Sequence, residues 1–256
     1  LAAISVHPYR VDALQALEQG AAAGARVVKW LPNAQGIDPA SEQCDAFYRK
    51  MKQLGLILLS HAGEEKAVES EDDQRLGNPL RLRRALDHGV RVIVAHCASF
   101  GHDVDLDDVR RPRVASFDLF VRLMAEKRYE GLLFGEISGL VLANRMGRPL
   151  RTLLERTDLH PRLVNGSDYP LPAINILIRT GQMVEEGLLT APQRDGLNEI
   201  YRVNPLLFDF VLKRTLRHPK TGSRFTASVF VDNPGLNLLS KPAAATLPLQ
   251  ATGASR

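Results

Sequence analysis

The sequence has few cysteines, few aromatic residues and no long apolar run. Cys44 and Cys97 are its only cysteines, so it supports neither a disulfide framework nor a cysteine-based zinc site. Aromatic residues make up 6% of the chain, and the arginines are scattered instead of forming one basic run with interleaved aromatics. No apolar stretch reaches membrane-spanning length. We therefore expect a small-molecule substrate as the partner, with no nucleic acid and no membrane, and we leave a homo-oligomer open.

The sequence also lacks a glycine-rich strand-turn-helix fingerprint, so it does not indicate dinucleotide binding by a doubly wound sheet. Aliphatic residues dominate the hydrophobic part of the composition. A chain of 256 residues at 45% hydrophobic can bury a full-sized core, and this length is common for one α/β barrel. The chain starts inside an apolar run at Leu1, without an initiator methionine. We interpret this as a missing N-terminus. We expect a cytoplasmic location, with a signal peptide upstream left open.

Six apolar runs are typical of strands that are buried in a parallel sheet. Each is followed by a long loop, a helix with a capping residue at its start, and in most cases a glycine at its end. This unit repeats every roughly 30 to 40 residues, as a βα fold requires. The predicted strands are Leu1–Val6, Arg26–Leu31, Leu56–Ser60, Val90–Ala95, Leu132–Ile137 and Leu163–Gly166. The predicted helix starts are Asp12, Asp38-Pro39, Asn78-Pro79, Ser116 and Pro149.

The chain divides into a barrel-like part and a tail. Residues 1–217 hold the six strands and, from about residue 174, a mainly helical stretch, which together form the predicted domain. Residues 218–256 are predicted to be a C-terminal arm and a disordered tail. Within the arm, residues 223–231 fit either one more strand or an irregular segment.

Four predicted strands end in a residue that can ligate a metal: Lys29, His61, His96 and Asp168. Each alone has a structural explanation, such as a capping histidine, an aspartate that stabilises its own turn, or a lysine that reaches the rim. Because all four occupy equivalent positions on separate parallel strands, we expect them to meet at one edge of the sheet. Imidazole, carboxylate and carbamylated lysine are all good ligands for zinc-like ions.

Three further residues at strand ends are candidates for substrate binding: Glu136, His7 and Arg10. For Glu136 a hydrogen-bonding role at the rim is the alternative. Cys97 follows His96 directly, so its side chain is expected on the opposite face of the strand as a buried structural thiol. His88 and His160 are expected to be structural, and Glu65 lies close enough in sequence to His61 to matter.

The residues in VVKWLP, LLSHAGEE, VIVAHCAS and NGSDYP give the chain a resemblance to the metal-dependent amidohydrolase superfamily. The similar branch includes aminocarboxymuconate-semialdehyde decarboxylase and lactone hydrolases, and the resemblance covers roughly residues 1–217. It implies an α/β fold of the (β/α)8 TIM-barrel type that holds one or two divalent metal ions, zinc above all. By this resemblance Lys29, His61, His96 and Asp168 are the metal ligands, and Asp168 and His96 are catalytic.

One departure from the family pattern is plain, because no His-x-His pair occurs anywhere in the 256 residues. Aligning the strands makes Leu1–Val6 the third strand of the barrel. The resemblance therefore implies that only strands 3 to 8 are present, that the barrel is incomplete, and that two metal ligands lie upstream.

The activity that the resemblance implies is hydrolysis of a C–O or C–N bond by a metal-activated water, with Asp168 as the general acid/base. One alternative keeps the superfamily and changes the reaction to non-oxidative decarboxylation or hydration, which generally proceeds without a carbamylated Lys29. Another alternative is a catalytically incomplete fragment, which only packs against a partner.

Overall fold

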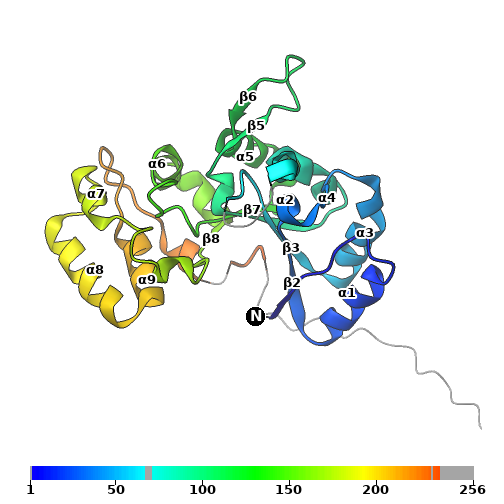
Figure 1. Cartoon of the computed structure of the whole chain (residues 1–256), viewed down its shortest axis with the longest axis horizontal. Helices are drawn as coiled ribbons and strands as arrows, with labels where there is room; N and C mark the ends of the chain where they lie inside the picture. Colours follow the sequence, from blue (N-terminus) through cyan, green and yellow to red (C-terminus); the bar gives the residue numbers. More distant parts are fainter. Residues whose placement is uncertain (1, 67–70, 232, 237–256) are drawn as a thin grey trace, which may run out of the picture.

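The computed structural model describes residues 2–66, 71–231 and 233–236, and it has a mixed α/β architecture around a parallel six-stranded sheet (Figure 1). The order in the sheet is β1-β2-β3-β4-β7-β8, so each strand lies beside the one before it in this series. A doubly wound sheet would reverse direction at a switch point, and this one does not. The strands are β1 (Ala2–Ile4), β2 (Ala25–Trp30), β3 (Ile57–His61), β4 (Arg91–Ala95), β7 (Leu133–Glu136) and β8 (Leu163–Val164).

All six predicted strands are confirmed, and their apolar residues divide between the two faces of the sheet. On one face, Val28, Leu58 and Val92 are fully buried in the main core, which the helices complete. On the other face, a small separate cluster joins Ile57, Ile93, Phe134 and Leu236. The exception is β1, which was expected to be buried but is an exposed edge of the sheet in the part of the chain that is described.

The helices form one group on each side of the sheet, with α5 and α6 between the two groups (Figure 1). Helices α1 to α4 lie near β2 and β3, and α7 to α9 lie near β8. Their bounds are α1 (Ala13–Ala22), α2 (Pro32–Gln35), α3 (Asp45–Leu54), α4 (Arg83–Asp87), α5 (Ser116–Met124), α6 (Arg148–Glu155), α7 (Thr180–Glu185), α8 (Ala191–Val203) and α9 (Pro205–Thr215).

Two predicted helix starts were wrong. Asp38 caps no helix: α3 begins only at Asp45, after a short 3-10 turn, and Asp38 accepts both hydrogen bonds of an ion pair with Arg81 at 2.8 Å. Ser116 is the first residue of α5 and not its cap, and its hydroxyl donates to Asp103 instead. Asp38 and Ser116 therefore form hydrogen bonds with side chains of other elements, and such distant partners cannot be predicted from local sequence.

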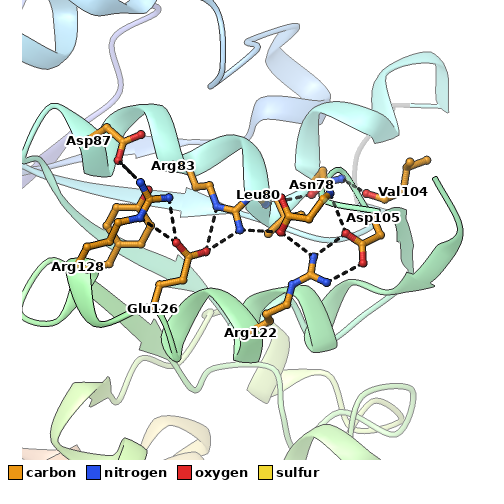
Figure 2. Close-up of polar contacts among 11 residues, drawn as sticks. Asn78, Leu80, Arg83, Asp87, Val104, Asp105, Arg122, Glu126 and Arg128 are labelled. Atoms are coloured by element: carbon orange, nitrogen blue, oxygen red, sulfur yellow. Dashed lines mark hydrogen bonds and ion pairs between the residues drawn. The ribbon is translucent and has the colours of Figure 1, made fainter. Parts of the chain in front are cut away.

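A hairpin that the sequence did not predict joins β5 (His102–Val104) to β6 (Arg113–Ala115). Figure 2 shows the charge network that fixes it to α4 and α5. Arg83 forms ion pairs with Asp107 at 2.5 Å and Glu126 at 2.6 Å, and Arg122 binds Asp105 at 2.6 Å. Single exposed pairs contribute little, but linked bidentate pairs hold a defined geometry.

The C-terminal arm packs along β8 as an irregular segment and not as a strand. The amide of Asn165, directly after β8, donates to the carbonyl of Val229 at 2.9 Å. Phe225 is buried and packs on His160, with ring centroids 5.5 Å apart. The predicted tail from residue 237 lies outside the described residues. Among the helices of the described segments, none is both long and apolar enough to cross a membrane.

Candidate functional site

The register of the sheet brings Lys29 and His61 to one face at the carboxyl ends of their strands, and the turn after β4 brings His96 to the same place. Lys29 pairs with Leu59, and His61 follows two residues later, so Lys29 and His61 point to the same side. His61 in turn pairs with Ala95, the residue before His96. The carboxyl edge of the parallel sheet therefore gathers residues that are far apart in sequence, and in α/β enzymes this edge is where active sites lie.

His61 and His96 meet edge to face at this edge, with ring centroids 5.5 Å apart. Both are buried, and burial is the main cause that lowers the pKa of His61 to about 3 and that of His96 to about 4. The positive charge of Arg145 lowers the pKa of His96 further. Both imidazoles are therefore neutral at physiological pH.

The neighbours of each imidazole determine which ring nitrogen carries the proton. Nδ1 of His96 lies 2.8 Å from the hydroxyl and 3.2 Å from the carbonyl oxygen of Ser138, and a carbonyl only accepts. Nδ1 of His61 lies 3.4 Å from a carboxylate oxygen of Glu65. We infer from these contacts that Nδ1 is the donor in both rings, so both Nε2 atoms carry a free lone pair.

In the part of the chain that the structure describes, no hydrogen-bond donor contacts either lone pair. Nε2 of His61 is buried without a hydrogen-bond partner in the described structure. Nε2 of His96 lies 3.7 Å from Oδ2 of Asp168, so two acceptors face each other. A cation between them would satisfy both, and Nδ1–H donation to a carboxylate or carbonyl is the usual support for a metal-bound histidine.

The backbone that presents His96 is strained. Residues 96, 97 and 98 have φ values of 55°, 50° and 48°, and none of them is glycine. Each left-handed residue of this kind costs roughly 1–2 kcal/mol. The turn directs the imidazole of His96 towards Asp168 and sends Cys97 to the other side, where its thiol donates to the carbonyl of Glu136 at 3.4 Å. The prediction of a buried thiol is confirmed, and burial raises the pKa of Cys97 strongly.

Glu136, at the end of β7, holds this turn in place. One carboxylate oxygen accepts from the hydroxyl of Ser138 at 2.5 Å and from the amide of His96 at 3.3 Å. The other accepts from the amide of Ser138. These contacts support the hydrogen-bonding alternative, and substrate binding by Glu136 stays a prediction.

Asp168 lies in the turn after β8 with a left-handed backbone (φ 54°), and its side chain is 37% exposed. Helix α9 supports this turn from behind. Nζ of Lys213 donates to the carbonyl of Gly166 at 2.6 Å and to Asp209 at 2.7 Å, and both side chains of this ion pair are buried. The carboxylate of Asp168, which faces His96, is therefore partly accessible to solvent, whereas the Lys213–Asp209 pair that supports its turn is buried.

Lys29 lies near the same carboxylates without an ion pair to any described acidic residue. Burial lowers its pKa, and the charges of Glu136, Asp168 and Glu65 raise it again by a smaller amount. A lowered pKa makes the neutral, nucleophilic amine more available. This is the form that carbamylation requires.

The two remaining candidates are engaged elsewhere. His7 contacts the carbonyl of Gln35 through Nε2 at 3.0 Å, and Arg10 forms an exposed ion pair with Asp12 at 2.6 Å. Within the described residues, neither His7 nor Arg10 contacts the histidine pair, and their roles in substrate binding stay predictions. Of the histidines expected to be structural, His88 binds Asp45 at 3.0 Å, and His160 binds the carbonyl of Leu153 at 2.7 Å.

Sequence reasoning missed two residues near His96. Ser138 contacts Nδ1 of His96, and the charge of Arg145 lowers the pKa of His96. Arg145 lies in the loop between β7 and α6, and nothing in the sequence distinguishes it from the other arginines.

A metal centre is not complete among the described residues: no group of three or more His, Cys, Asp or Glu side chains is placed to hold an ion. The donors that are present, two Nε2 lone pairs and a carboxylate, fit zinc in type.

Comparisons with known proteins add little. No model of a known protein family matches the chain, and no curated protein matches it. Among the solved structures, the chain is similar to an uncharacterized TIM-barrel protein from Bordetella bronchiseptica, with a TM-score of 0.46 and 15% identity. The match covers 66% of this chain and 53% of that protein, so the chain spans about half of its length. No statement about function follows from this likeness.

Proposed function

We propose that the chain is part of a (β/α)8 barrel of the amidohydrolase superfamily and that it acts as a metal-dependent hydrolase of a C–O or C–N bond. One observation carries the proposal. His61, His96 and Asp168 come from the ends of three strands, and among the described residues no donor contacts Nε2 of either imidazole. The order of the parallel strands, each beside the last, also supports a barrel over a doubly wound sheet.

The residues fit a metal such as zinc in three respects. Both histidines are neutral, which is the ligating form. A buried, unpaired nitrogen on His61 costs about 1–3 kcal/mol, which a bound cation would offset. The amine of Lys29 lies near Asp168 with a lowered pKa, which suits a carbamate. When bound, zinc would lower the pKa of a water molecule towards about 7 and so supply hydroxide near neutral pH.

The protein groups have separate tasks in this proposal. Asp168 is exposed enough to meet a substrate, and its carboxylate accepts a proton from the attacking water and returns it to the leaving group. His96 and His61 would hold the cation, because their Nε2 atoms are the acceptors without a donor in the described structure. Ser138 fixes the orientation of His96 because it accepts the Nδ1 proton, and the carboxylate of Glu65 lies 3.4 Å from Nδ1 of His61 on the side away from Nε2.

Metal content of the purified protein tests the proposal. After equilibration with zinc and removal of the excess, we expect about one equivalent or more per chain by elemental analysis. Asp168→Asn, His61→Asn and His96→Asn should each bind at least about tenfold more weakly. His102→Asn, which replaces an exposed histidine of the hairpin, is the matched control and should bind like the wild type.

The fold of each variant is checked by the fluorescence of Trp30, the only tryptophan, which is fully buried against Phe47 and Tyr48. If the folded wild type takes up no zinc, the strand-end residues are structural and the hydrolase proposal fails. If it does bind zinc, hydrolysis of a panel of esters, lactones and amides that depends on Asp168 completes the test.

A further inference from the structure

A buried histidine attaches residues 223–231 of the C-terminal arm (the arm segment) to the chain that leads into β8. His160 lies in the 3-10 helix Thr157–Arg162, directly before β8. Its side chain is 0% exposed, and its ring packs on Phe225 of the arm segment with ring centroids 5.5 Å apart. The arm segment therefore covers His160 and excludes water from it.

Both ring nitrogens of His160 face backbone groups whose hydrogen-bonding roles are fixed. Nε2 lies 2.7 Å from the carbonyl oxygen of Leu153 in α6, and a carbonyl only accepts. Nδ1 lies 3.2 Å from the amide nitrogen of Thr226 in the arm segment, and an amide N–H only donates. These two contacts are satisfied together only by the neutral ring with its proton on Nε2.

Protonation of His160 would place two donors opposite each other. The imidazolium carries a second N–H at Nδ1, which points at the amide of Thr226, so this hydrogen bond is lost and a buried donor is left unsatisfied.

The positive charge of a protonated His160 would also be poorly compensated. Burial lowers the pKa of His160, and the carbonyl of Leu153 and the charge of Asp158 raise it by less. Asp158 already binds Arg156 at 2.7 Å. Within the described segments, neither α6 nor the arm segment contributes a charged group that acts on the ring.

The other contacts that hold the arm segment contain no group that titrates between pH 5 and 8. The amide of Asn165, after β8, donates to the carbonyl of Val229 at 2.9 Å. Phe230 packs on Phe210 of α9, with ring centroids 5.5 Å apart. His218, earlier in the arm, accepts from two amides of its own loop, those of Lys220 and Thr221.

We propose that His160 is a pH switch for the arm segment: the neutral ring holds residues 223–231 against β8, and the protonated ring releases the hydrogen bond to Thr226 and loosens them. This inference goes beyond the proposed hydrolase and does not depend on it, because neither a metal nor a substrate takes part. Asn165 leads into the turn of Asp168, so the loosened segment also gives up its contact with the chain before that turn.

Hydrogen exchange of the full chain, measured by mass spectrometry with a chelator present, tests the proposal at pH 7.5 and 5.5. Exchange rates are corrected for the intrinsic effect of pH. Once exposed, His160 takes up a proton with a pKa of about 6.5, so the open fraction of the segment rises by up to about tenfold between these pH values. The protection of peptides from residues 223–231 should fall by about three- to tenfold.

Two substitutions should fix the switch in opposite states. In His160→Gln the side-chain amide offers an acceptor to Thr226 and a donor to Leu153 but cannot be protonated, so the protection should be the same at both pH values. In Thr226→Pro the ring replaces the amide hydrogen that faces Nδ1, and the φ of −70° suits proline. Its arm segment should be weakly protected at both pH values.

His218→Asn is the matched control, because it removes the other histidine of the arm and keeps an acceptor for Lys220 and Thr221. Its arm segment should show the wild-type fall. Peptides from β4 report the unfolding of the whole chain. They should keep their own pH dependence in His160→Gln, because His61 and His96 are unchanged.

The proposal is overturned if the protection of the wild-type arm segment does not change with pH, if the change survives in His160→Gln, or if His218→Asn abolishes it. Equal protection of the arm segment and β4 in wild type would also overturn it, because the segment would then open only with the whole fold. Should His160→Gln fail to fold, wild type, His218→Asn and Thr226→Pro still decide.

Discussion

The two buried histidines should make the stability of the metal-free protein depend on pH between 7.5 and 5.5. In the folded state the pKa of His61 is about 3 and that of His96 about 4, whereas the unfolded value is about 6.5. The unfolded chain therefore binds more protons below pH 6.5. Their contribution to stability is complete above this pH and is lost as the pH falls towards the folded values.

The expected loss follows from these values. Each histidine contributes a slope of about 1.4 kcal/mol per pH unit once the pH is below the unfolded pKa. Between pH 7.5 and 5.5 only about one unit lies below it, so each histidine costs roughly 1.3 kcal/mol and the pair about 2–3 kcal/mol. His160 adds to this loss because burial lowers its pKa, whereas Asp103 and Asp209 act in the opposite direction because burial raises theirs.

The contributions of His160, Asp103 and Asp209 to the pH dependence cancel when wild type is compared with His61→Asn, because both proteins contain these groups. Urea unfolding followed by Trp30 fluorescence, with a chelator present, gives the free energy of unfolding at both pH values. The loss between pH 7.5 and 5.5 should be about 1 kcal/mol smaller in His61→Asn, because one titrating group is gone. His102→Asn should keep the wild-type loss. If wild type and His61→Asn lose the same free energy, His61 titrates normally in the folded protein and the argument from its burial is wrong.

Two further substitutions test how the site is supported. Lys213→Met should destabilise the protein by about 3–5 kcal/mol in urea unfolding, because it leaves Asp209 as an uncompensated buried charge and leaves the carbonyl of Gly166 without its donor. A second substitution, Asp209→Leu, should recover part of this loss. If Lys213→Met leaves the free energy of unfolding unchanged, α9 does not support the turn of Asp168. Gly135→Ala should lower the free energy of unfolding by about 1–3 kcal/mol, because the new Cβ would lie 2.7 Å from both the sulfur of Cys97 and the ring of Phe120. Gly196→Ala in α8 should instead raise it by about 0.5–1 kcal/mol, because no atom lies within 4 Å of the new Cβ. Equal effects at the two glycines would contradict the packing described for β7.

The strands were predictable because their signal is local. Runs such as Val27–Leu31 and Val90–Ala95 are continuous and aliphatic, and only a strand covered on both faces suits them. The placement of His61 and His96 at strand ends follows from the same runs. The meeting of these histidines with Asp168 was predicted only as a consequence of parallel strands, whose carboxyl ends share one edge.

What could not be predicted depends on contacts between distant residues. The strands of the β5–β6 hairpin are three residues long, too short to show a period, and are fixed by ion pairs such as that of Arg122 with Asp105. Asp-Pro at position 38 has the form of a helix start, yet Arg81 engages the aspartate. The isolation of Arg145 from the described carboxylates is likewise a property of the fold, because its sequence neighbours say nothing about charge balance.

Several features that cost free energy lie together at one edge of the sheet. Buried polar atoms without a hydrogen-bond partner also occur elsewhere among the described residues, as at Oδ1 of Asn33 and Oδ1 of Asp209, but there they occur singly. At the edge, three successive residues adopt a left-handed backbone, a buried histidine nitrogen has no partner, and an imidazole acceptor faces a carboxylate. Folding alone gains nothing from such features, and each costs free energy. A bound cation at His61, His96 and Asp168 would offset two of these costs together, the unpartnered nitrogen of His61 and the facing acceptors of His96 and Asp168, which is why the proposed function is placed at this edge.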